Sequence, residues 1–228
     1  MKKKWRITKR SSGPTLRSGL PQSAALCPYR AMSEISKKID AIINLDLKAL
    51  MKTKGFKKKA RNFYKELDCG VFLLVNVQGS MYNDNQEARY TVNLGVFFPE
   101  IYEMVGFGNV GTVPSIPDCS ITKRLGHLKP EKTDYWWQLT PESNLQQLAT
   151  NLSVSVEQYG LSWLQRNSSI SGASAELKGQ NPFTAAATAF IEGNRAEAAG
   201  IINKIISKGS AAKSRAISWG KKYKLLEA

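Results

Sequence analysis

The sequence is poor in the residues that most often build metal and catalytic sites. His127 is its single histidine, and its three cysteines, Cys27, Cys69 and Cys119, are widely spaced without a C-x-x-C pair. A zinc site of the usual cysteine and histidine type therefore lacks ligands, and an odd number of unpatterned cysteines is typical of a reduced, intracellular protein. We expect no metal site and no cofactor.

Long hydrophobic runs are also missing. The longest apolar run near the basic N-terminus, residues 24–27, is shorter than the roughly 7 to 15 residues of a signal-peptide core. No run approaches the roughly 20 residues that a membrane-spanning helix needs. The sequence therefore predicts a cytoplasmic protein without a membrane partner, in which residues 1–31 are a disordered basic tail or an upstream extension.

Acidic residues are absent from three stretches of the chain. Overall, 33 Lys and Arg stand against 18 Asp and Glu, a net charge of +15. Residues 1–31 and 48–65 hold eight cations each and residues 198–226 hold seven, all without an acid. The remainder carries ten cations against all 18 acids, so the basicity is segmental, which is typical of a chain that presents an anion-facing patch.

Hydrophobic periodicity predicts an α+β fold that begins with a helix. Apolar residues recur at helical spacing over residues 33–54, and the period then shortens. Five β-branched and aromatic runs follow, at residues 62–67, 71–78, 89–97, 119–124 and 134–139. Turn residues between these runs favour an antiparallel sheet of four to five strands. In the third run apolar and polar residues alternate, so one face of the sheet should pack and the other should be polar.

The remainder of the chain is predicted to be mostly helical. Residues 140–142 (Thr-Pro-Glu) have the form of a cap followed by a helix-starting proline, and residues 167–180 have the composition of a polar loop. Asn181, Asn194 and Ser210 are expected to cap three further helices. We therefore predict an α+β domain over residues 32–166 and a helical C-terminal subdomain, residues 181–228, packed on it.

One segment interleaves cations with aromatic residues. Residues 54–65 read KGFKKKARNFYK, a combination with which nucleic-acid-binding proteins contact phosphates through Lys and Arg while aromatic rings stack on bases. The alternative is an edge strand that turns Phe63 inward and its lysines outward, where lysine also prevents pairing with another chain.

Two further pairs of residues could carry chemistry or binding. Cys119 and His127 could form a thiolate and imidazole pair, provided that they lie within hydrogen-bond reach and that the thiol pKa is lowered. The alternative is a buried strand cysteine and an ordinary loop histidine. The adjacent Trp136 and Trp137 should place one indole in the core, while the other lines a surface or is covered by a C-terminal helix.

Several motifs in a defined order resemble a known family. They are LMKTKGFKKK at 50–59 leading into 62–64, VNVQGS at 75–80, YTVNLGV at 90–96, residues 119–128 with Arg124 and Gly126, and residues 134–139 with the paired tryptophans. Over about residues 34–165 the chain resembles the bacterial family catalogued as domain of unknown function 4304 (DUF4304). The resemblance implies a small α+β domain with no established catalysis or cofactor, and a loose association with immunity or accessory proteins in toxin neighbourhoods.

The leading prediction is a non-enzymatic module that binds a protein partner, because no acid, base and nucleophile set converges in the sequence and several aromatic anchors are available. The alternatives are nucleic-acid binding through residues 54–65 and an enzyme that uses Cys119 and His127. The candidate binding residues are Lys54, Phe56, Lys57, Lys58, Lys59, Arg61, Tyr64, Gln78, Asn93, Arg124, Trp136 and Trp137.

Overall fold

The computed structural model describes residues 34–68, 70–84, 86–106, 108, 110–209 and 211–226. The chain divides into two units, Met1–Ala31 and Met32–Ala228, and the second contains all of the described residues. The tail prediction for residues 1–31, together with Cys27, Cys69 and the proposed cap Ser210, lies outside the described residues.

Helices and strands follow one another as an α+β chain. The helices are α1 (Glu34–Ile42), the π-helical turn η1 (Ile43–Leu47), α2 (Lys48–Thr53), α3 (Pro99–Val105), the 3-10 turns η2 (Ile116–Asp118) and η3 (Leu125–Leu128), α4 (Leu145–Ser155), the π-helical turn η4 (Val156–Leu161), α5 (Ser162–Arg166), α6 (Ile170–Lys178), α7 (Pro182–Ile191), α8 (Arg195–Ser207) and α9 (Lys213–Lys222). The strands are β1 (Lys57–Lys59), β2 (Asn62–Glu66), β3 (Phe72–Gly79), β4 (Ala88–Phe97), β5 (Ile121–Arg124) and β6 (Trp137–Leu139).

The strands form one antiparallel sheet in the order β1-β2-β3-β4-β5, with β6 also paired to β4. The long strand β4 pairs with β5 at one end and with β6 at the other. The predicted α+β class is confirmed. The sheet has one strand more than expected because residues 57–59 fold back on β2 through a tight turn, in which Ala60 has φ 52°.

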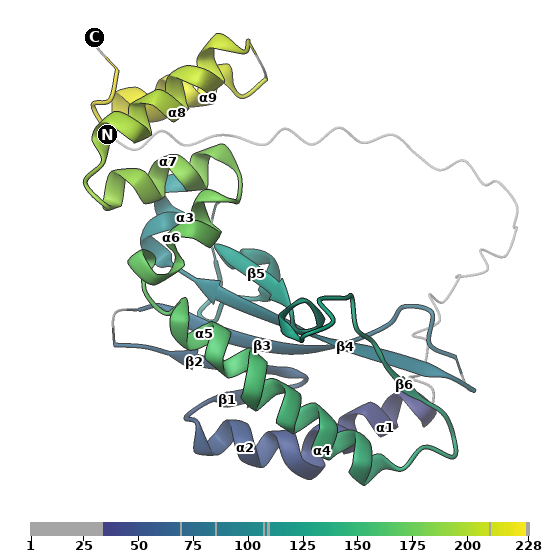
Figure 1. The fold of residues 1–228 in the computed structure, drawn as a ribbon. Coiled ribbons are helices and arrows are strands. Elements are labelled where there is room, and N and C mark those ends of the chain that lie inside the picture. The colour runs from purple at the N-terminus through teal and green to yellow at the C-terminus, as the bar shows by residue number, and fades with distance from the viewer. Residues whose placement is uncertain are drawn as a thin grey trace, which may run out of the picture. The chain divides into compact units, whose positions relative to one another are not determined.

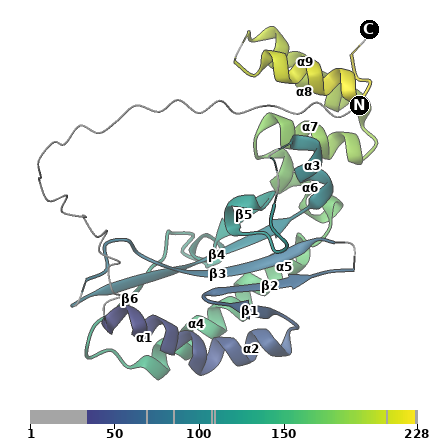
Figure 2. The same ribbon diagram turned by 180° about the vertical axis from the view of Figure 1, so that it is seen from behind.

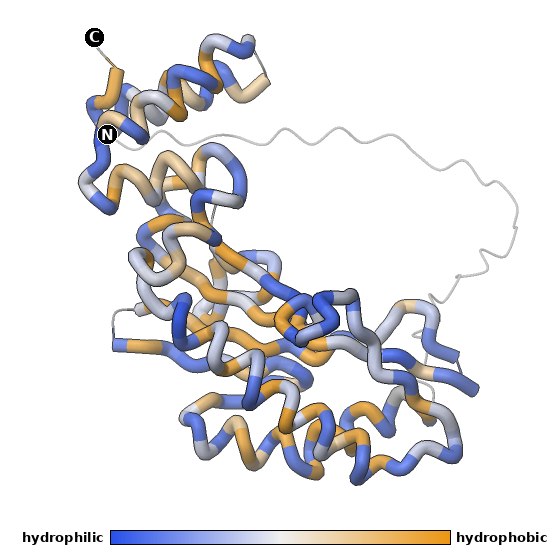
Figure 3. Tube along the Cα trace, in the orientation of Figure 1, coloured by the Kyte–Doolittle hydropathy of each residue, from blue (hydrophilic) through white to orange (hydrophobic). Residues whose placement is uncertain are grey.

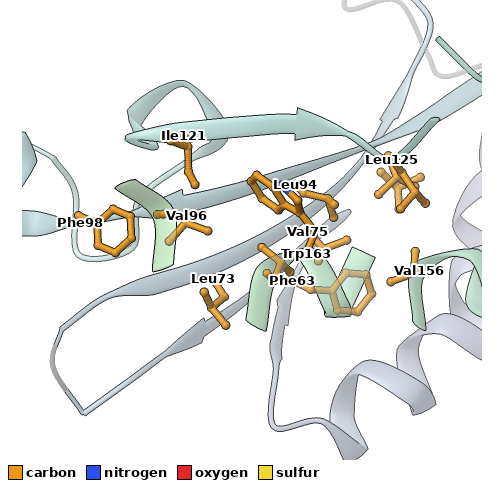
Figure 4. Packing of buried hydrophobic residues seen from close by; sticks show 14 of the residues in the cluster. Phe63, Leu73, Val75, Leu94, Val96, Phe98, Ile121, Leu125, Val156 and Trp163 are labelled. Atoms are coloured by element: carbon orange, nitrogen blue, oxygen red, sulfur yellow. The ribbon is translucent and has the colours of Figure 1, made fainter. Parts of the chain in front are cut away.

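Four helices cover one face of the sheet. Figures 1 and 2 show α1, α2, α4 and α5 on the same side of the strands. Phe63, Val75 and Leu94 are register partners on three neighbouring strands, so they share this face. They pack with Val156 of η4 and Trp163 of α5, which continue the helix that begins with α4 (Figure 4). In Figure 3 these helices alternate between hydrophobic and hydrophilic positions, as expected for helices with one face on a core.

The predicted start of the second long helix is wrong by several residues. It begins at Leu145, and the Asn144 side chain caps it by accepting a hydrogen bond from the backbone N–H of Gln147 at 3.1 Å. Thr140 belongs instead to a turn, because the Ser143 hydroxyl accepts its backbone N–H at 2.9 Å. An asparagine side chain is among the best N-caps, and it prevails here over the proline signal.

The predicted polar loop at residues 167–180 is also wrong, because it contains α6. Ser169 caps this helix by accepting the backbone N–H of Gly172, and Ala173 and Leu177, four residues apart, are buried. These two positions and the partly buried Ile170 are too few to outweigh polar neighbours in a sequence window, yet they suffice once a core is present to receive them.

Helices α7, α8 and α9 pack one on the next, and α7 packs on α3, a helix that hydrophobic periodicity did not predict. The Trp219 indole donates to the carbonyl of Met104 at 2.8 Å, and Arg215 donates to the carbonyl of Val105. Arg215 and Trp219 therefore hold α9 to the end of α3, while the domain boundaries at residues 166 and 181 stay a prediction.

Candidate functional site

The face of the sheet opposite α1, α4 and α5, called here the outer face, carries a continuous row of polar residues. By strand register, Lys59, Asn62, Asn76, Asn93 and Arg124 are successive partners on β1 to β5. Directly paired residues of antiparallel strands point to the same side. The alternation of the strands therefore places all five side chains on this face, and we call these five residues the polar row.

The amides of the polar row are joined by hydrogen bonds. Asn93 Nδ2 donates to Asn76 Oδ1 at 3.1 Å and to Gln78 Oε1 at 2.7 Å, and Asn76 Nδ2 donates to Asn62 Oδ1 at 2.8 Å. These bonds fix which way each amide points. Within the described residues, the amide nitrogens of Asn62 and Gln78 donate to no protein acceptor, so both can donate outward to a ligand.

Arg124, Asp134 and Trp136 form a fixed cluster at the β5 end of the polar row. Arg124 Nη1 donates to both Asp134 carboxylate oxygens at 2.7 and 2.6 Å, and Trp136 Nε1 donates to Asp134 Oδ2 at 3.1 Å. The guanidinium carbon of Arg124 also lies 5.0 Å from the centre of the Trp136 ring. The Thr91 hydroxyl donates to the carbonyl of Tyr135 at 2.9 Å and holds this segment against β4. The result is a half-exposed indole of defined orientation.

At its other end the outer face is covered and apolar. Phe72, Leu74, Phe97 and Tyr102 are buried together there. Val110, Ile116, Cys119 and Tyr64 pack against this cluster. Gly95 is required for this cover, since a Cβ at that position would lie 2.5 Å from Cys119 Sγ. The accessible part of the outer face is therefore its polar part, from Asn76 and Gln78 to Trp136.

Comparison with known proteins gives a family and no function. The family described as Domain of unknown function (DUF4304) matches residues 47–166, just over half of the chain. The chain belongs to this family. No curated protein and no solved structure matches it. The matched range of the DUF4304 domain contains all six strands and the long helix that packs beneath them, and so it contains the whole outer face.

The outer face of the DUF4304 domain brings together some of the predicted binding residues. Gln78, Asn93, Arg124 and Trp136 lie at its accessible part, as described above. Lys57 and Tyr64 are register partners that share this face with Lys59 at the β1 edge. The alternation within residues 90–96 predicted a polar face, but nothing in the sequence indicated that Asn62 and Asn76 would align with Asn93 across strands.

Other predicted residues are used within the fold. Phe56 is buried, and Arg61 donates to both carboxylate oxygens of Asp40 in α1 at 2.7 and 2.9 Å. Lys54 pairs with Glu157 at 2.8 Å. Lys58 is the register partner of Phe63 and so points to the helix-covered side of the sheet edge.

Trp137 is the core member of the tryptophan pair. It is 2 % exposed, stacks on Tyr90 with ring centres 5.5 Å apart, and donates to Asn151 Oδ1 of α4 at 2.8 Å. Trp136, by contrast, remains half-exposed beside Arg124.

The two described basic segments do not meet. Residues 48–65 belong to α2, β1 and β2, whereas residues 198–226 belong largely to α8 and α9. These two groups of elements lie at opposite ends of the described unit (Figures 1 and 2). A single extended cationic surface is therefore not formed by them.

Cys119 and His127 are not paired in the DUF4304 domain. The Cys119 thiol donates to the carbonyl of Ser115 at 3.4 Å, and burial, followed by the nearby Asp118 charge, raises the pKa of the thiol well above its ordinary value. His127 Nδ1 lies 3.4 Å from the carbonyl of Lys132. A thiol with a raised pKa is a poor nucleophile at neutral pH. Within the described residues, there is also no group of three or more His, Cys, Asp or Glu that could hold a metal ion.

No helix in the described part of the chain combines the length and apolar character needed to cross a membrane.

The stability that Asp134 provides should depend on pH. Hydrogen bonds, first from Arg124 and then from Trp136, hold the pKa of Asp134 below its ordinary value of 3.8. A depressed carboxylate pKa stabilises the fold at neutral pH, and this contribution is lost as the pH falls through the folded-state pKa. Because the Asp134 side chain is 48 % exposed, solvent screening keeps the effect small.

We expect Asp134→Asn to lower the free energy of unfolding by about 0.5–1 kcal/mol at pH 7. The difference from the unmodified chain should shrink as the pH falls below 3.8, the ordinary aspartate pKa. Urea unfolding at a series of pH values measures this, and a difference that stays constant down to the acid range would contradict it. The Trp136 indole N–H resonance should titrate over the same range in the unmodified chain and not in the variant.

Proposed function

We propose that this DUF4304 domain is a protein-binding module that uses the accessible part of its outer face. The observation that carries the proposal is the fixed Arg124 and Trp136 pair beside a hydrogen-bonded row of amides on the accessible part of the outer face. Trp, Tyr and Arg are the residue types that dominate binding energy at protein interfaces. Side chains already held in one arrangement lose less conformational entropy on binding, which favours affinity.

The charge distribution favours a protein over a nucleic acid as the partner. Nucleic-acid affinity comes mainly from several unpaired cations that contact phosphates. On the outer face Arg124 is engaged by Asp134 and Arg89 by Glu87, at 2.6 and 2.7 Å. Two other cations of the outer face, Lys57 and Lys59 at the β1 edge, have no ion-pair partner among the described residues. Two lysines at one edge do not make the extended phosphate-binding track that the nucleic-acid alternative requires.

A photo-crosslinking residue tests the proposal. In cells that naturally produce the chain, benzoylphenylalanine at Gln78, the exposed centre of the face, should give a discrete adduct with one protein. The same group at Gln147, an exposed position of α4 on the other side of the sheet, is the matched control and should not give that adduct.

The adduct from position 78 should fall at least tenfold when Arg124 and Trp136 are both changed to Ala, in a variant shown to be folded by its thermal unfolding. Equal adducts from positions 78 and 147 would overturn the proposal. An adduct that disappears on nuclease treatment would replace it by the nucleic-acid alternative.

A further inference from the structure

A separate groove lies between α6, α7 and α8, away from the outer face. Its cavity volume is 520 Å³, and its lining includes Phe183, Ala185, Ile201, Lys204, Ile205 and Lys208. Phe183, Ala185 and Ile205 are each less than 10 % exposed and form an apolar floor. We call this feature the α7–α8 groove. It is of the size and mostly apolar character typical of small-molecule sites, which range over about 300–1,000 Å³.

One stripe of α8 gives the groove both its apolar and its charged lining. Ile201, Lys204 and Ile205 of α8, together with its C-cap residue Lys208, which keeps helical backbone angles, follow the i, i+3, i+4, i+7 spacing of a single helical face. Two isoleucines therefore lie along the floor while two lysines, one turn apart, stand above them. Lysine stems can cover apolar surface while their ammonium groups reach toward solvent, so both chemical characters are available to one ligand.

The two lysines above the floor have no acidic partner among the described residues. The third lysine of the groove, Lys178, is shared by Glu192 at 2.9 Å and Glu197 at 3.1 Å, which leaves both of these acids occupied. Hydrogen bonds from Lys178 to these two carboxylates also raise the pKa of Lys178. Lys204 and Lys208 form no ion pair within the described residues, and like charges four residues apart on a helix destabilise it. An anion between their ammonium groups would relieve that repulsion.

We propose that the α7–α8 groove binds a free anionic amphiphile, a medium-chain carboxylate whose head lies between Lys204 and Lys208 and whose hydrocarbon body lies on Phe183, Ile201 and Ile205. Charge complementarity selects the head, and the apolar floor selects the body. The groove volume of 520 Å³ favours a small molecule over a protein surface, because protein interfaces are broad and bury roughly 800 Å² per partner.

Calorimetric titration of the full chain with decanoate below its micelle concentration tests the proposal. We expect saturable binding at one site, with decanol and acetate each binding at least tenfold more weakly, because decanol lacks the charge and acetate lacks the body. Absence of saturable binding, or equal binding of decanol, would overturn the proposal. Binding to vesicles of anionic phospholipid without binding of free decanoate would also overturn it, in favour of a membrane surface.

Charge variants locate the site. Changing Lys204 and Lys208 together to Glu should weaken decanoate binding at least tenfold, whereas Lys213→Glu, an exposed lysine of α9 outside the groove, should change it less than twofold. If the double Glu variant does not fold, as judged by circular dichroism, the Lys204→Gln and Lys208→Gln double variant should still show the weakening. Unchanged affinity in a folded double variant would show that decanoate binds elsewhere and would refute the assignment.

Discussion

Replacing Trp137 by alanine should lower the free energy of unfolding by about 3–5 kcal/mol, the range for truncating a large aromatic side chain in a core. Trp137 is 2 % exposed and packs against Tyr90, with Tyr135 edge-on at 4.8 Å. Its removal leaves a cavity between β6, β4 and α4. It also removes the indole N–H that donates to Asn151 Oδ1 of α4 at 2.8 Å.

The neighbouring Trp136→Ala is the matched control for this experiment. Trp136 keeps part of its ring in solvent, and its contacts are a hydrogen bond to Asp134 and the stacked Arg124. We expect a loss of only about 1 kcal/mol, because exposed contacts of this kind are worth little. Urea unfolding of both variants measures the contrast. Equal losses would mean that the two indoles do not divide between core and surface as described.

Replacing Gly126 by alanine should have the second large effect. A Cβ at this position would lie 2.3 Å from the carbonyl oxygen of Thr133 and 2.5 Å from the backbone nitrogen of Tyr135. Backbone atoms cannot yield as the end of a side chain can, so the turn after β5 must open. We expect a loss of about 2–4 kcal/mol, at or above the usual range for overpacking.

The same substitution at Gly200 should stabilise the protein instead of destabilising it. Gly200 lies inside α8, and a Cβ there would meet nothing within 4 Å. Alanine in a helix interior is favoured over glycine by about 0.5–1 kcal/mol, so this variant should be more stable. Thermal and urea unfolding should therefore show a lower free energy of unfolding for Gly126→Ala and a higher one for Gly200→Ala. A stabilised or unchanged Gly126→Ala would contradict the close packing of this turn.

The Gly126→Ala substitution should also disturb the arrangement of Arg124 and Trp136 on the outer face. Gly126 follows Arg124 by two residues, and the backbone it contacts leads directly into Asp134 and Trp136. Opening the turn should separate Arg124 from Asp134 and reduce the crosslink from position 78. Gly200→Ala should leave that crosslink unchanged, because α8 lies outside the outer face.

The elements that could be predicted from the sequence are those with strong local signals. The helix ending before Gly55, the strands around residues 71–78 and 89–97, and the helices capped by Asn181 and Asn194 appear where periodicity and caps predicted them. The failures came where local signals were weak or in competition. Helix α6 depends on two buried residues, and β1 depends on pairing with β2.

The candidate site was predicted in part, and the reason is the range of the interactions involved. Alternation within residues 90–96 placed Asn93 on a polar face, but a hydrogen bond between Asn93 and Asn76 depends on the register of two strands. A slip of one residue would turn each side chain to the opposite face. Nothing in the sequence indicated that Asp134 would bond to Arg124, since that bond spans ten positions and a change of direction at Gly126.

The scarcity of histidine and cysteine by itself determined that a zinc site of the usual kind lacks ligands. Periodicity and cap residues determined the α+β class, because each acts within a few residues along the chain. Tertiary structure alone decided which polar residues meet on the outer face, which tryptophan is buried, and that the basic segments lie apart. These outcomes depend on strand register and on packing between distant segments, and neither is encoded in any short stretch of sequence.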